Sequence, residues 1–220
     1  MEETLEERKE TGQPQPEIKG PLKGIRILDL GHAGAGPVGP TLLAEWGAEV
    51  IKVETPEGGN VMRKLPPLHQ GQSFMYLLQG RNKKSITVDL HTEEGQEAIR
   101  RLVKESDVVL ENYRPDTLER WNLGYEELKK AKEDIIFIRV SGFGQEGPYR
   151  RRTSYDTVGA AMGGVHHLTG HPEGSPALLG YGMCDWLTAA FNALASLIAL
   201  RYRKKTGQGQ WADIPQYEAI

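Results

Sequence analysis

The chain of 220 residues has little of several features that define protein classes: it has one cysteine, a formal net charge of −3 and no long uninterrupted apolar run. A single cysteine excludes a disulfide framework and a zinc site built from several thiolates, and it favours a reducing compartment. The longest apolar stretch, Leu187 to Leu200, has 14 residues with polar ones among them, whereas a membrane-spanning helix needs about 20. We therefore expect a cytoplasmic protein with no membrane segment.

The small net charge lies at the amino terminus. Residues 1–20 hold six acids and three bases, which leaves the rest of the chain neutral. A non-specific nucleic-acid binder normally has a strong basic excess, so we expect no nucleic-acid partner. The same 20 residues are rich in Glu, Gln and Pro and nearly lack large apolar side chains. This composition predicts a disordered acidic tail, followed by one folded domain over residues 21–220.

Strand-like and helix-like segments alternate through the folded part. Short runs typical of strands lie at residues 24–30, 48–54, 106–111 and 134–140, and residues 84–90 alternate polar and apolar side chains as a strand does. Helical periodicity occupies residues 41–46, 92–104, 125–132 and 185–204, and residues 141–182 form a glycine-rich stretch without clear periodicity. The alternation predicts an α/β fold: a doubly wound, mostly parallel, Rossmann-like sheet with helices on both faces.

A glycine-rich turn follows the first predicted strand. Its only G-x-G-x-x-G window, Gly34 to Gly39, contains Pro37. This is a weak match to the dinucleotide-binding fingerprint, so a nicotinamide site is disfavoured, while a loop that approaches some other ligand stays open. The neighbouring His166, His167 and His171 lie in a Gly- and Pro-rich segment with few other ligand types, which disfavours a metal site.

Asp185 lies between a glycine-containing loop and the start of the last predicted helix. An acid there serves either as an N-cap or as a carboxylate held at the positive end of the helix dipole. Taken alone, the residue type favours the capping role, because Asp is among the preferred N-cap residues.

A set of ordered motifs resembles the class III CoA-transferases, the family that includes formyl-CoA transferases, carnitine CoA-transferases and α-methylacyl-CoA racemases. The motifs are PLKGIRILDL at 21–30, LAEWGAEVIKVE at 43–54, RNKKSI at 81–86, DVVLENYRP at 107–115, SGFGQEGPY at 141–149 and KTGQGQ at 205–210. Their order covers residues 21–220 without a large gap.

The resemblance implies that coenzyme A passes from an acyl-CoA donor to a carboxylic-acid acceptor, with no metal and no redox cofactor. In the family's transferases the acid at the position of Asp185 is the nucleophile, which reverses the preference for a cap. A carboxylate can attack a thioester to give a mixed anhydride, and the released thiolate can convert that anhydride into an enzyme-bound aspartyl thioester. An incoming acid then takes the CoA.

The resemblance also carries over a set of CoA contacts. They are Gly34, Ala35, Val88, Asp89, Leu90, His91, Asn112, Tyr113, Arg114, Arg120, Tyr155 and Asp156. Two positions depart from formyl-CoA transferases: Gly34 often has a larger or polar counterpart, and Thr55 stands where Arg is common. Some adenine and phosphate contacts are therefore expected to differ.

Two alternatives remain open. The first alternative is racemisation of an acyl-CoA, for which the family's racemases use a His/Asp pair. Their His falls where this chain has Tyr155. Tyrosine, with a pKa of about 10, is a poor base near neutral pH, which favours CoA transfer over racemisation. The second alternative is that the chain is a non-catalytic subunit or a fragment. Family members are longer, have a smaller second domain and form interlocked dimers. On that basis residues 21–220 are the large N-terminal domain, incomplete at its C-terminus, in a homodimer or related heteromer.

Overall fold

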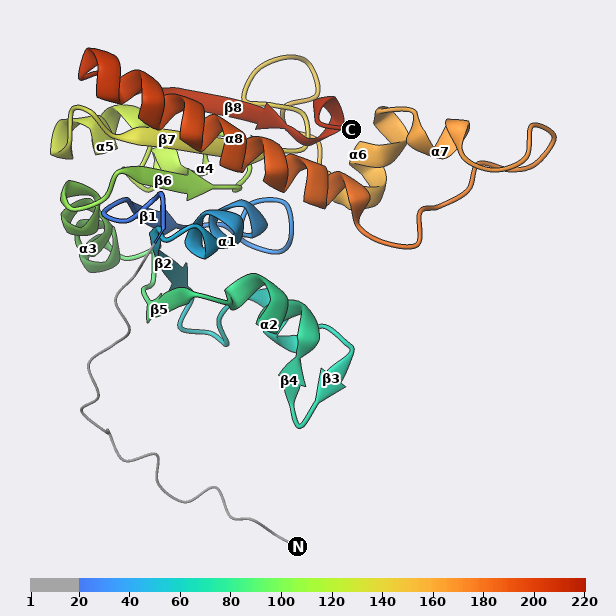
Figure 1. Ribbon diagram of the computed structural model, residues 1–220, viewed down its shortest axis with the longest axis horizontal. Helices are drawn as coiled ribbons and strands as arrows, with labels where there is room; N and C mark the ends of the chain where they lie inside the picture. The colour runs from blue at the N-terminus through green and yellow to red at the C-terminus, as the bar shows by residue number, and fades with distance from the viewer. Residues whose placement is uncertain (1–19) are drawn as a thin grey trace, which may run out of the picture.

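The computed structural model describes residues 20–220, so the predicted tail lies outside the described residues except for Gly20. Its centre is a six-stranded sheet (Figure 1). The strands are β1 (Arg26–Asp29), β2 (Glu49–Glu54), β5 (Lys83–Thr87), β6 (Val108–Glu111), β7 (Ile136–Ser141) and β8 (Trp211–Pro215). They pair in the order β5-β2-β1-β6-β7-β8, and every pairing is parallel. The predicted doubly wound parallel sheet is confirmed.

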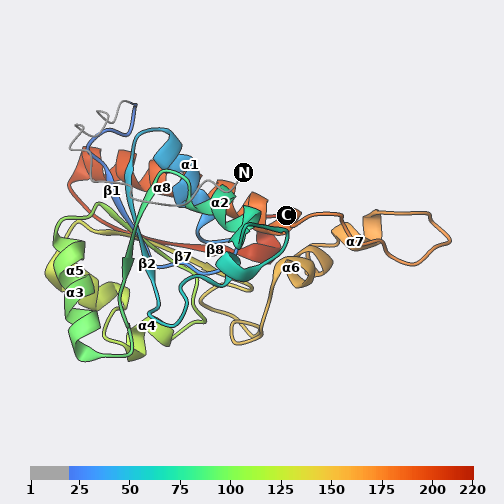
Figure 2. The ribbon, with the colours of Figure 1, turned by 90° about the horizontal axis from the view of Figure 1, so that it is seen from below.

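Each central strand supplies alternate residues to two cores. In β1, Ile27 faces one core and Leu28 the other, and in β7 the same division separates Ile136 from Phe137. The first core is covered by α1 (Val38–Glu45) and α8 (Met183–Thr206), and the second by α3 (Glu93–Lys104), α4 (Thr117–Arg120) and α5 (Tyr125–Ala131). Figure 2 shows the two helix layers on opposite sides of the sheet. Burial on both faces explains why these strands are continuous apolar runs.

Helix α8 is longer than the apolar stretch that reveals it in the sequence. By length and composition alone it is long and apolar enough to cross a membrane, a property that buried helices of soluble proteins share. In this fold it packs lengthwise against α1 and β7 (Figure 1), and Ala193 and Ala199 enter the core. Packing on the sheet accounts for the buried face of α8 only, because Phe191, Leu194 and Ile198 on the helix are 45%, 49% and 58% exposed.

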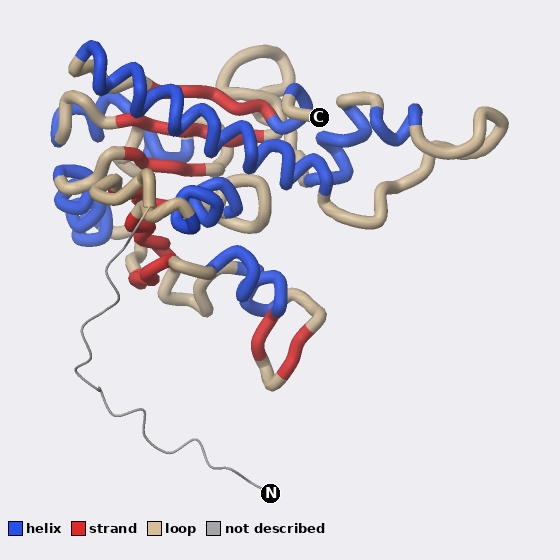
Figure 3. Tube along the Cα trace, in the orientation of Figure 1, coloured by secondary structure: helices blue, strands red, loops and turns tan. Residues whose placement is uncertain are grey.

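Two excursions leave the sheet. Between β2 and β5 the chain forms η1 (Val61–Lys64), β3 (Leu68–His69), β4 (Gln72–Ser73) and α2 (Phe74–Gly80), which lie beyond the β5 edge (Figure 1). After β7 come α6 (Asp156–Met162) and α7 (Val165–Leu168), and after β8 the short η2 (Gln216–Glu218). Figure 3 shows the long loop that follows α7 and leads to α8.

The element predictions missed α2 and α4, and they were wrong in three further places. The stretch 141–182 contains α6 and α7, whose few turns of small residues and glycines carry no helical apolar pattern. Strand β5 ends at Thr87, so residues 88–90 belong to the loop that follows. Strand β8 was missed because its sequence, WADIP, is short and includes Asp and Pro, which are both uncommon in strands.

The carboxyl ends of all six strands meet at one edge of the sheet. At that edge β1 leads toward α1 on one face, whereas its neighbour β6 leads toward α4 on the other face. The two loops diverge there and leave a crevice, which is where doubly wound proteins bind their ligands. The glycine-rich turn after β1 and the Asn112-Tyr113-Arg114 segment after β6 both lie at this point.

Candidate active site

A cavity of about 660 Å³ opens at the divergence of the β1 and β6 loops. Its walls come from those two loops, from η1 and the residue that follows it, from the end of β7, from residues 153–156, from the first turn of α8 and from η2. The lining residues are His32, Ala33, Gly34, Ala35, Val61, Met62, Leu65, Asn112, Arg114, Val140, Ser141, Gly142, Thr153, Ser154, Tyr155, Asp156, Asp185 and Gln216. Seven of the thirteen residues predicted for the site are among them.

Asp185 lies in the first turn of α8 and does not cap it. The N-cap is Gly182, and no side chain caps the helix, so the capping interpretation is wrong. The backbone N–H of Asp185 donates to Oδ1 of Asp156 at 2.8 Å, and Nε2 of Gln216 donates to Oδ1 of the Asp185 carboxylate. The carboxylate is thus oriented by its neighbours and presented to the cavity rather than used to end the helix.

Gly34 forms the surface on which the Asp185 carboxylate rests. A Cβ atom added to Gly34 would lie 2.1 Å from Oδ2 of Asp185, far inside van der Waals contact. Only glycine lets the loop backbone and the carboxylate approach so closely. The structure therefore brings together two residues that are 151 positions apart in the sequence.

The surroundings of Asp185 make it an unusual carboxylate. Burial, and secondarily the negative charge of Asp156, raise its pKa to about 6, although the hydrogen bond from Gln216 acts in the opposite direction. At neutral pH the group is still mostly ionised, but its anion is less stabilised than that of an exposed carboxylate. An anion of this kind is a stronger nucleophile and a stronger base.

The glycine turn is held from two sides. From β6, Asn112 accepts the backbone N–H of His32 at 2.6 Å and donates from Nδ2 to the His32 carbonyl at 2.8 Å. From α8, Nδ2 of Asn192 donates to the carbonyls of Ala35 and Gly36 at 2.9 and 3.2 Å. Because α8 also carries Asp185, these bonds tie the helix of Asp185 to the loop on which its carboxylate rests.

A buried charged cluster supports the same turn from within the sheet. Lys83 donates to Asp29 at 2.8 Å and to the carbonyl of Pro37 at 2.6 Å, while Lys52 donates to Asp29 at 3.3 Å and to the carbonyl of Gly31. Although burial opposes it, the two ammonium groups hold the pKa of Asp29 below its usual range. The cluster thus fixes both ends of the turn.

The side chain of His32 is neutral at physiological pH. Burial, reinforced by the positive charge of Lys52, lowers its pKa to about 4. Its Nε2 atom lies 2.5 Å from the hydroxyl of Tyr113, and the two rings meet edge to face at 4.8 Å. His32 therefore adds no positive charge to the cavity wall.

The comparison with known protein families decides the membership of the chain. Residues 22–220 match CoA-transferase family III. The chain belongs to this family. The resemblance seen in the sequence motifs is thereby confirmed, and the fold and the motifs agree on the same assignment.

Relatives of this chain include proteins named as CoA-transferases. It is 49% identical over 201 residues to the succinyl-CoA–D-citramalate CoA-transferase of Chloroflexus aurantiacus, covering 91% of this chain and 50% of that protein. It is 40% identical over 206 residues to the succinyl-CoA:glutarate CoA-transferase of Mus musculus, covering 92% and 47%. The chain spans about half the length of the curated relatives it matches.

Solved structures show the same fold. A CaiB/BaiF family protein from Brucella suis superposes with a TM-score of 0.87 at 38% identity, covering 91% of this chain and 54% of that one. A hypothetical protein from Mycobacterium tuberculosis gives a TM-score of 0.83 at 35% identity, covering 92% and 56%. The architecture is thus that of family III.

The remaining predicted contacts of the family III site lie outside the cavity lining. Aromatic rings connect part of them to it: Tyr113 meets Trp121 at 5.1 Å, and Trp121 meets His91 at 4.7 Å. Asp89 accepts the backbone N–H of His91 at 2.9 Å, and Arg120 donates to the hydroxyl of Thr117 at 3.0 Å. Val88 and Leu90 flank the same turn. A role in binding CoA stays a prediction for this group.

Sequence reasoning missed several residues that shape the site. Gln216, which orients Asp185, comes directly after the unrecognised strand β8. The hydroxyl of Ser154 donates to Oε1 of Gln216 at 3.0 Å, so Ser154 positions the side chain that in turn orients Asp185. Asn192 is fully buried in α8. The signal that could have found it in the sequence is an asparagine within an otherwise apolar helical stretch, because a buried amide needs hydrogen-bond partners.

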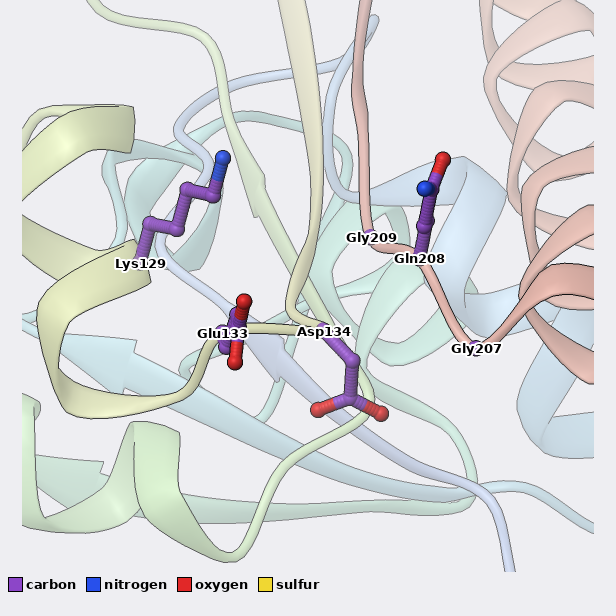
Figure 4. A pocket seen from close by; sticks show the side chains of 6 residues that line it. All are labelled: Lys129, Glu133, Asp134, Gly207, Gln208 and Gly209. Carbon is purple, nitrogen blue, oxygen red and sulfur yellow. The ribbon is translucent and has the colours of Figure 1, made fainter.

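A second hollow, of about 540 Å³, lies near the opposite ends of the strands, between the turn before β7 and the turn after α8. The side chains of Lys129 and Asp134 point away from one another there (Figure 4). Asp134 pairs with Arg203 at 3.5 Å. Within residues 20–220 no three His, Cys, Asp or Glu side chains are grouped as metal ligands. The cavity at Asp185 is the candidate active site.

Proposed function

We propose that the protein, in the complete form of its family III relatives, transfers coenzyme A from an acyl-CoA to a carboxylic acid, with Asp185 as the nucleophile. The observation that carries this proposal is the Asp185 carboxylate, held against the bare backbone of Gly34 in a cavity at the carboxyl edge of the sheet. The names of the relatives, which pair succinyl-CoA with citramalate or glutarate, support an acyl-CoA donor and an acid acceptor.

The first half of the reaction loads the enzyme. An oxygen of Asp185 attacks the thioester carbonyl, the carbon–sulfur bond breaks, and CoA leaves as a thiolate from a mixed anhydride. The thiolate then attacks the aspartyl carbonyl of that anhydride, which releases the donor's acid and leaves an aspartyl-CoA thioester. The acceptor reverses these two steps. Each exchange joins species of similar energy, and a single carboxylate serves throughout.

The residues around Asp185 suit these steps. Burial and the charge of Asp156 raise the energy of the ground-state anion, which favours its attack. Gly34 and Ala35 bring peptide groups close to the reacting carbonyl without an intervening side chain, and peptide N–H groups can stabilise an oxyanion. The apolar side chains of Val61, Met62 and Leu65 form one wall of the cavity and oppose entry of water to the anhydride.

The remaining predicted contacts complete the proposal for CoA. Asn112, Tyr113, Tyr155 and Asp156 lie on or next to the cavity, and the group around His91 extends from it along the aromatic rings. We assign them to the CoA moiety because a molecule with a long pantetheine arm must continue beyond a cavity that receives only its thioester end. We also propose a cytoplasmic location and assembly from two subunits.

The decisive experiment replaces the nucleophile. With succinyl-CoA and a panel of carboxylic acids, we expect wild-type protein to form new acyl-CoA species by mass spectrometry, and hydroxylamine to trap the loaded aspartate. Asp185→Asn should reduce transfer by at least about 10³-fold, because the amide cannot attack, while binding of CoA persists. Transfer that survives Asp185→Asn would refute Asp185 as nucleophile.

Two further arms separate the alternatives. Incubation with a chiral 2-methylacyl-CoA in deuterated water tests racemisation, and α-deuteration without an added acid would favour that reaction over transfer. The second arm compares this 220-residue chain with a protein of the length of its relatives. Transfer by the longer protein alone would mean that the chain holds the nucleophile but depends on further residues for activity.

A further inference from the structure

We propose that Gln216 is a catalytic residue, whose side-chain amide stabilises the negative charge that collects on Oδ1 whenever the side-chain carbonyl of Asp185 is attacked. The inference rests on the proposed CoA transfer and adds a second group to it. It goes beyond holding the carboxylate in place, because it assigns Gln216 to particular steps and Oδ2 to the attack on the donor.

The two oxygens of the Asp185 carboxylate have different surroundings. Nε2 of Gln216 lies 2.5 Å from Oδ1, and this is the one hydrogen bond that the carboxylate accepts among residues 20–220. Oδ2 lies over Gly34, where an added Cβ would meet it at 2.1 Å. Oδ2 has no donor to release before it forms a new bond, so it is the oxygen placed to attack the thioester. Oδ1 then becomes the carbonyl oxygen of the aspartyl half of the mixed anhydride, beside Nε2.

Negative charge collects on Oδ1 in two of the proposed steps. First, the CoA thiolate adds to Cγ of Asp185, the bond from Cγ to Oδ2 breaks, and the electron pair leaves on Oδ2 as part of the donor's acid. Later, the acceptor's carboxylate adds to the same carbon, the carbon–sulfur bond breaks, and the thiolate takes the pair. Neither step moves a proton. A donor at Oδ1 binds both transition states more tightly than the anhydride or the thioester, because the full charge exists only there.

The amide of Gln216 is fixed before that charge develops. The hydroxyl of Ser154 donates to Oε1 at 3.0 Å, which leaves the NH2 group facing Asp185. Gly159 of α6 packs on the same side chain, since an added Cβ there would meet Cγ and Cδ of Gln216 at 3.1 and 3.3 Å. The thiol of Cys184 donates to the backbone carbonyl of Gln216 at 3.3 Å. Only 4% of Gln216 is exposed, and a donor held in this way needs no reorganisation during the reaction.

A neutral donor suits this position better than a cation. An ion pair with Lys or Arg would hold the pKa of Asp185 low and weaken the carboxylate as a nucleophile. The hydrogen bond from Gln216 also lowers this pKa, but burial and the charge of Asp156 outweigh it, and the pKa stays raised at about 6. With the peptide groups of Gly34 and Ala35 assigned to the donor's carbonyl, the two carbonyls of the anhydride have separate oxyanion donors.

The test measures which carbonyl hydroxylamine attacks. With succinyl-CoA, attack on the aspartyl carbonyl leaves a hydroxamate on Asp185, whereas attack on the donor's carbonyl of the anhydride releases succinyl hydroxamate. Mass spectrometry gives the ratio of protein-bound to released hydroxamate, after subtraction of the product formed with Asp185→Asn protein. We expect Gln216→Met to lower this ratio by about 10²-fold and CoA transfer to fall with it, because losing one oxyanion donor costs on the order of 10²–10³ in rate.

Gln145→Met is the matched control. Gln145 is also a buried glutamine, but it lies outside the cavity lining, and its Nε2 has no hydrogen-bond partner among the described residues. We expect this variant to leave the ratio unchanged. Ser154→Ala keeps Gln216 and removes the bond that fixes its amide. The ratio should then fall by about 3- to 10-fold, the effect of one neutral hydrogen bond, which tests the proposal even where Gln216→Met does not fold.

The outcomes separate this proposal from the proposed reaction. If Gln216 only orients the carboxylate, Gln216→Met lowers both hydroxamates equally, and such an unchanged ratio would overturn the proposal. An unchanged ratio in Ser154→Ala would do the same where Gln216→Met does not fold. Wild-type protein that forms no hydroxamate dependent on Asp185 would instead refute the proposed function. All arms use the 220-residue chain, or the protein of the length of its relatives where that one alone transfers CoA.

Discussion

The contact between Gly34 and Asp185 depends on the absence of a single methyl group. The carboxylate occupies the space where a Cβ would be, so any side chain at position 34 must move the Asp185 carboxylate or the turn. In the proposed reaction, position 34 therefore affects catalysis more than folding. Sequence comparison alone marks Gly34 as a departure from formyl-CoA transferases, and the structure shows what the departure accommodates.

Gly34→Ala is expected to impair the reaction more than the fold. The added methyl would lie 2.1 Å from Oδ2 of Asp185, so the carboxylate must turn away from its working position. Displacement of this size typically costs about 10²-fold in rate. Steady-state transfer assays and thermal unfolding would measure the two effects. Gly180→Ala is the control, because its Cβ meets open space; equal activity of the two variants would contradict the prediction.

The raised pKa of Asp185 predicts an acidic limb in the pH profile. Since the ionised carboxylate is the proposed nucleophile, kcat/KM should increase as the pH rises through about 6 and then level off. Asp156→Asn removes the neighbouring negative charge that helps to raise this pKa, so the limb should move to lower pH. A profile that is the same in both proteins would show that Asp185 does not control this limb.

The same pKa has a consequence for stability. Above pH 6 the folded protein holds Asp185 ionised in a site that disfavours its charge, and this cost disappears as the pH falls from about 6 toward the unfolded value of 3.8. Asp185→Asn should therefore stabilise the fold at pH 8 by on the order of 1–3 kcal/mol and by less at pH 5. Chemical denaturation at both pH values provides the measurement.

At the scale of elements, the site depends on how closely α1 and α8 cross. A Cβ added to Gly39 in α1 would meet Oδ1 of Asn192 at 1.5 Å, so the two helices approach where one of them has no side chain. This contact lets Asn192 reach past α1 to the carbonyls of Ala35 and Gly36. Asn192 of α8 thus helps to fix the position of the glycine turn after β1.

Asn192→Ala is expected to loosen that connection. It removes the donor of two hydrogen bonds and leaves buried loop carbonyls without it, which costs about 1–3 kcal/mol. The rate should fall as well, because the turn that carries Gly34 loses its link to α8. Ser196→Ala serves as the comparison, since its hydroxyl bonds only within its own helix, at 2.8 Å to the Asn192 carbonyl. Matching unfolding free energies for the two variants would argue against the coupling.

At the scale of the whole molecule, Asp29 joins β1, β2 and β5 through Lys52 and Lys83. Asp29→Asn leaves two buried ammonium groups without their counter-charge and should destabilise the fold by about 3–5 kcal/mol. The unfolding free energy from denaturant titration would show this. Glu49 of β2 forms more exposed ion pairs with Arg26 of β1 and Lys84 of β5. Glu49→Gln should therefore lower the unfolding free energy by less than about 1 kcal/mol.

Much of this architecture could be predicted, and the exceptions have physical reasons. The central strands, which are buried on both faces, are rich in apolar residues, and the edge strand β5 lies in a segment that alternates polar and apolar residues. Five of the six sheet strands were therefore found from the sequence, and their loops could be assigned to one edge. Strand β8 lies at the edge of the sheet with its residues only half-buried, and such a strand carries no continuous apolar signal. Gln216 was lost with it, because its place beside Asp185 exists only once β8 pairs with β7.

The two oxygens of Asp185 are not equivalent, since Gln216 donates to Oδ1 while Oδ2 lies over Gly34. In the proposed cycle one oxygen of the carboxylate departs with the donor's acid, and the acceptor supplies its replacement. An acceptor enriched in heavy oxygen would consequently label Asp185 within a single turnover, and the label would be visible in the peptide that contains it. The nucleophile would then carry an isotopic record of the last acid that the enzyme converted.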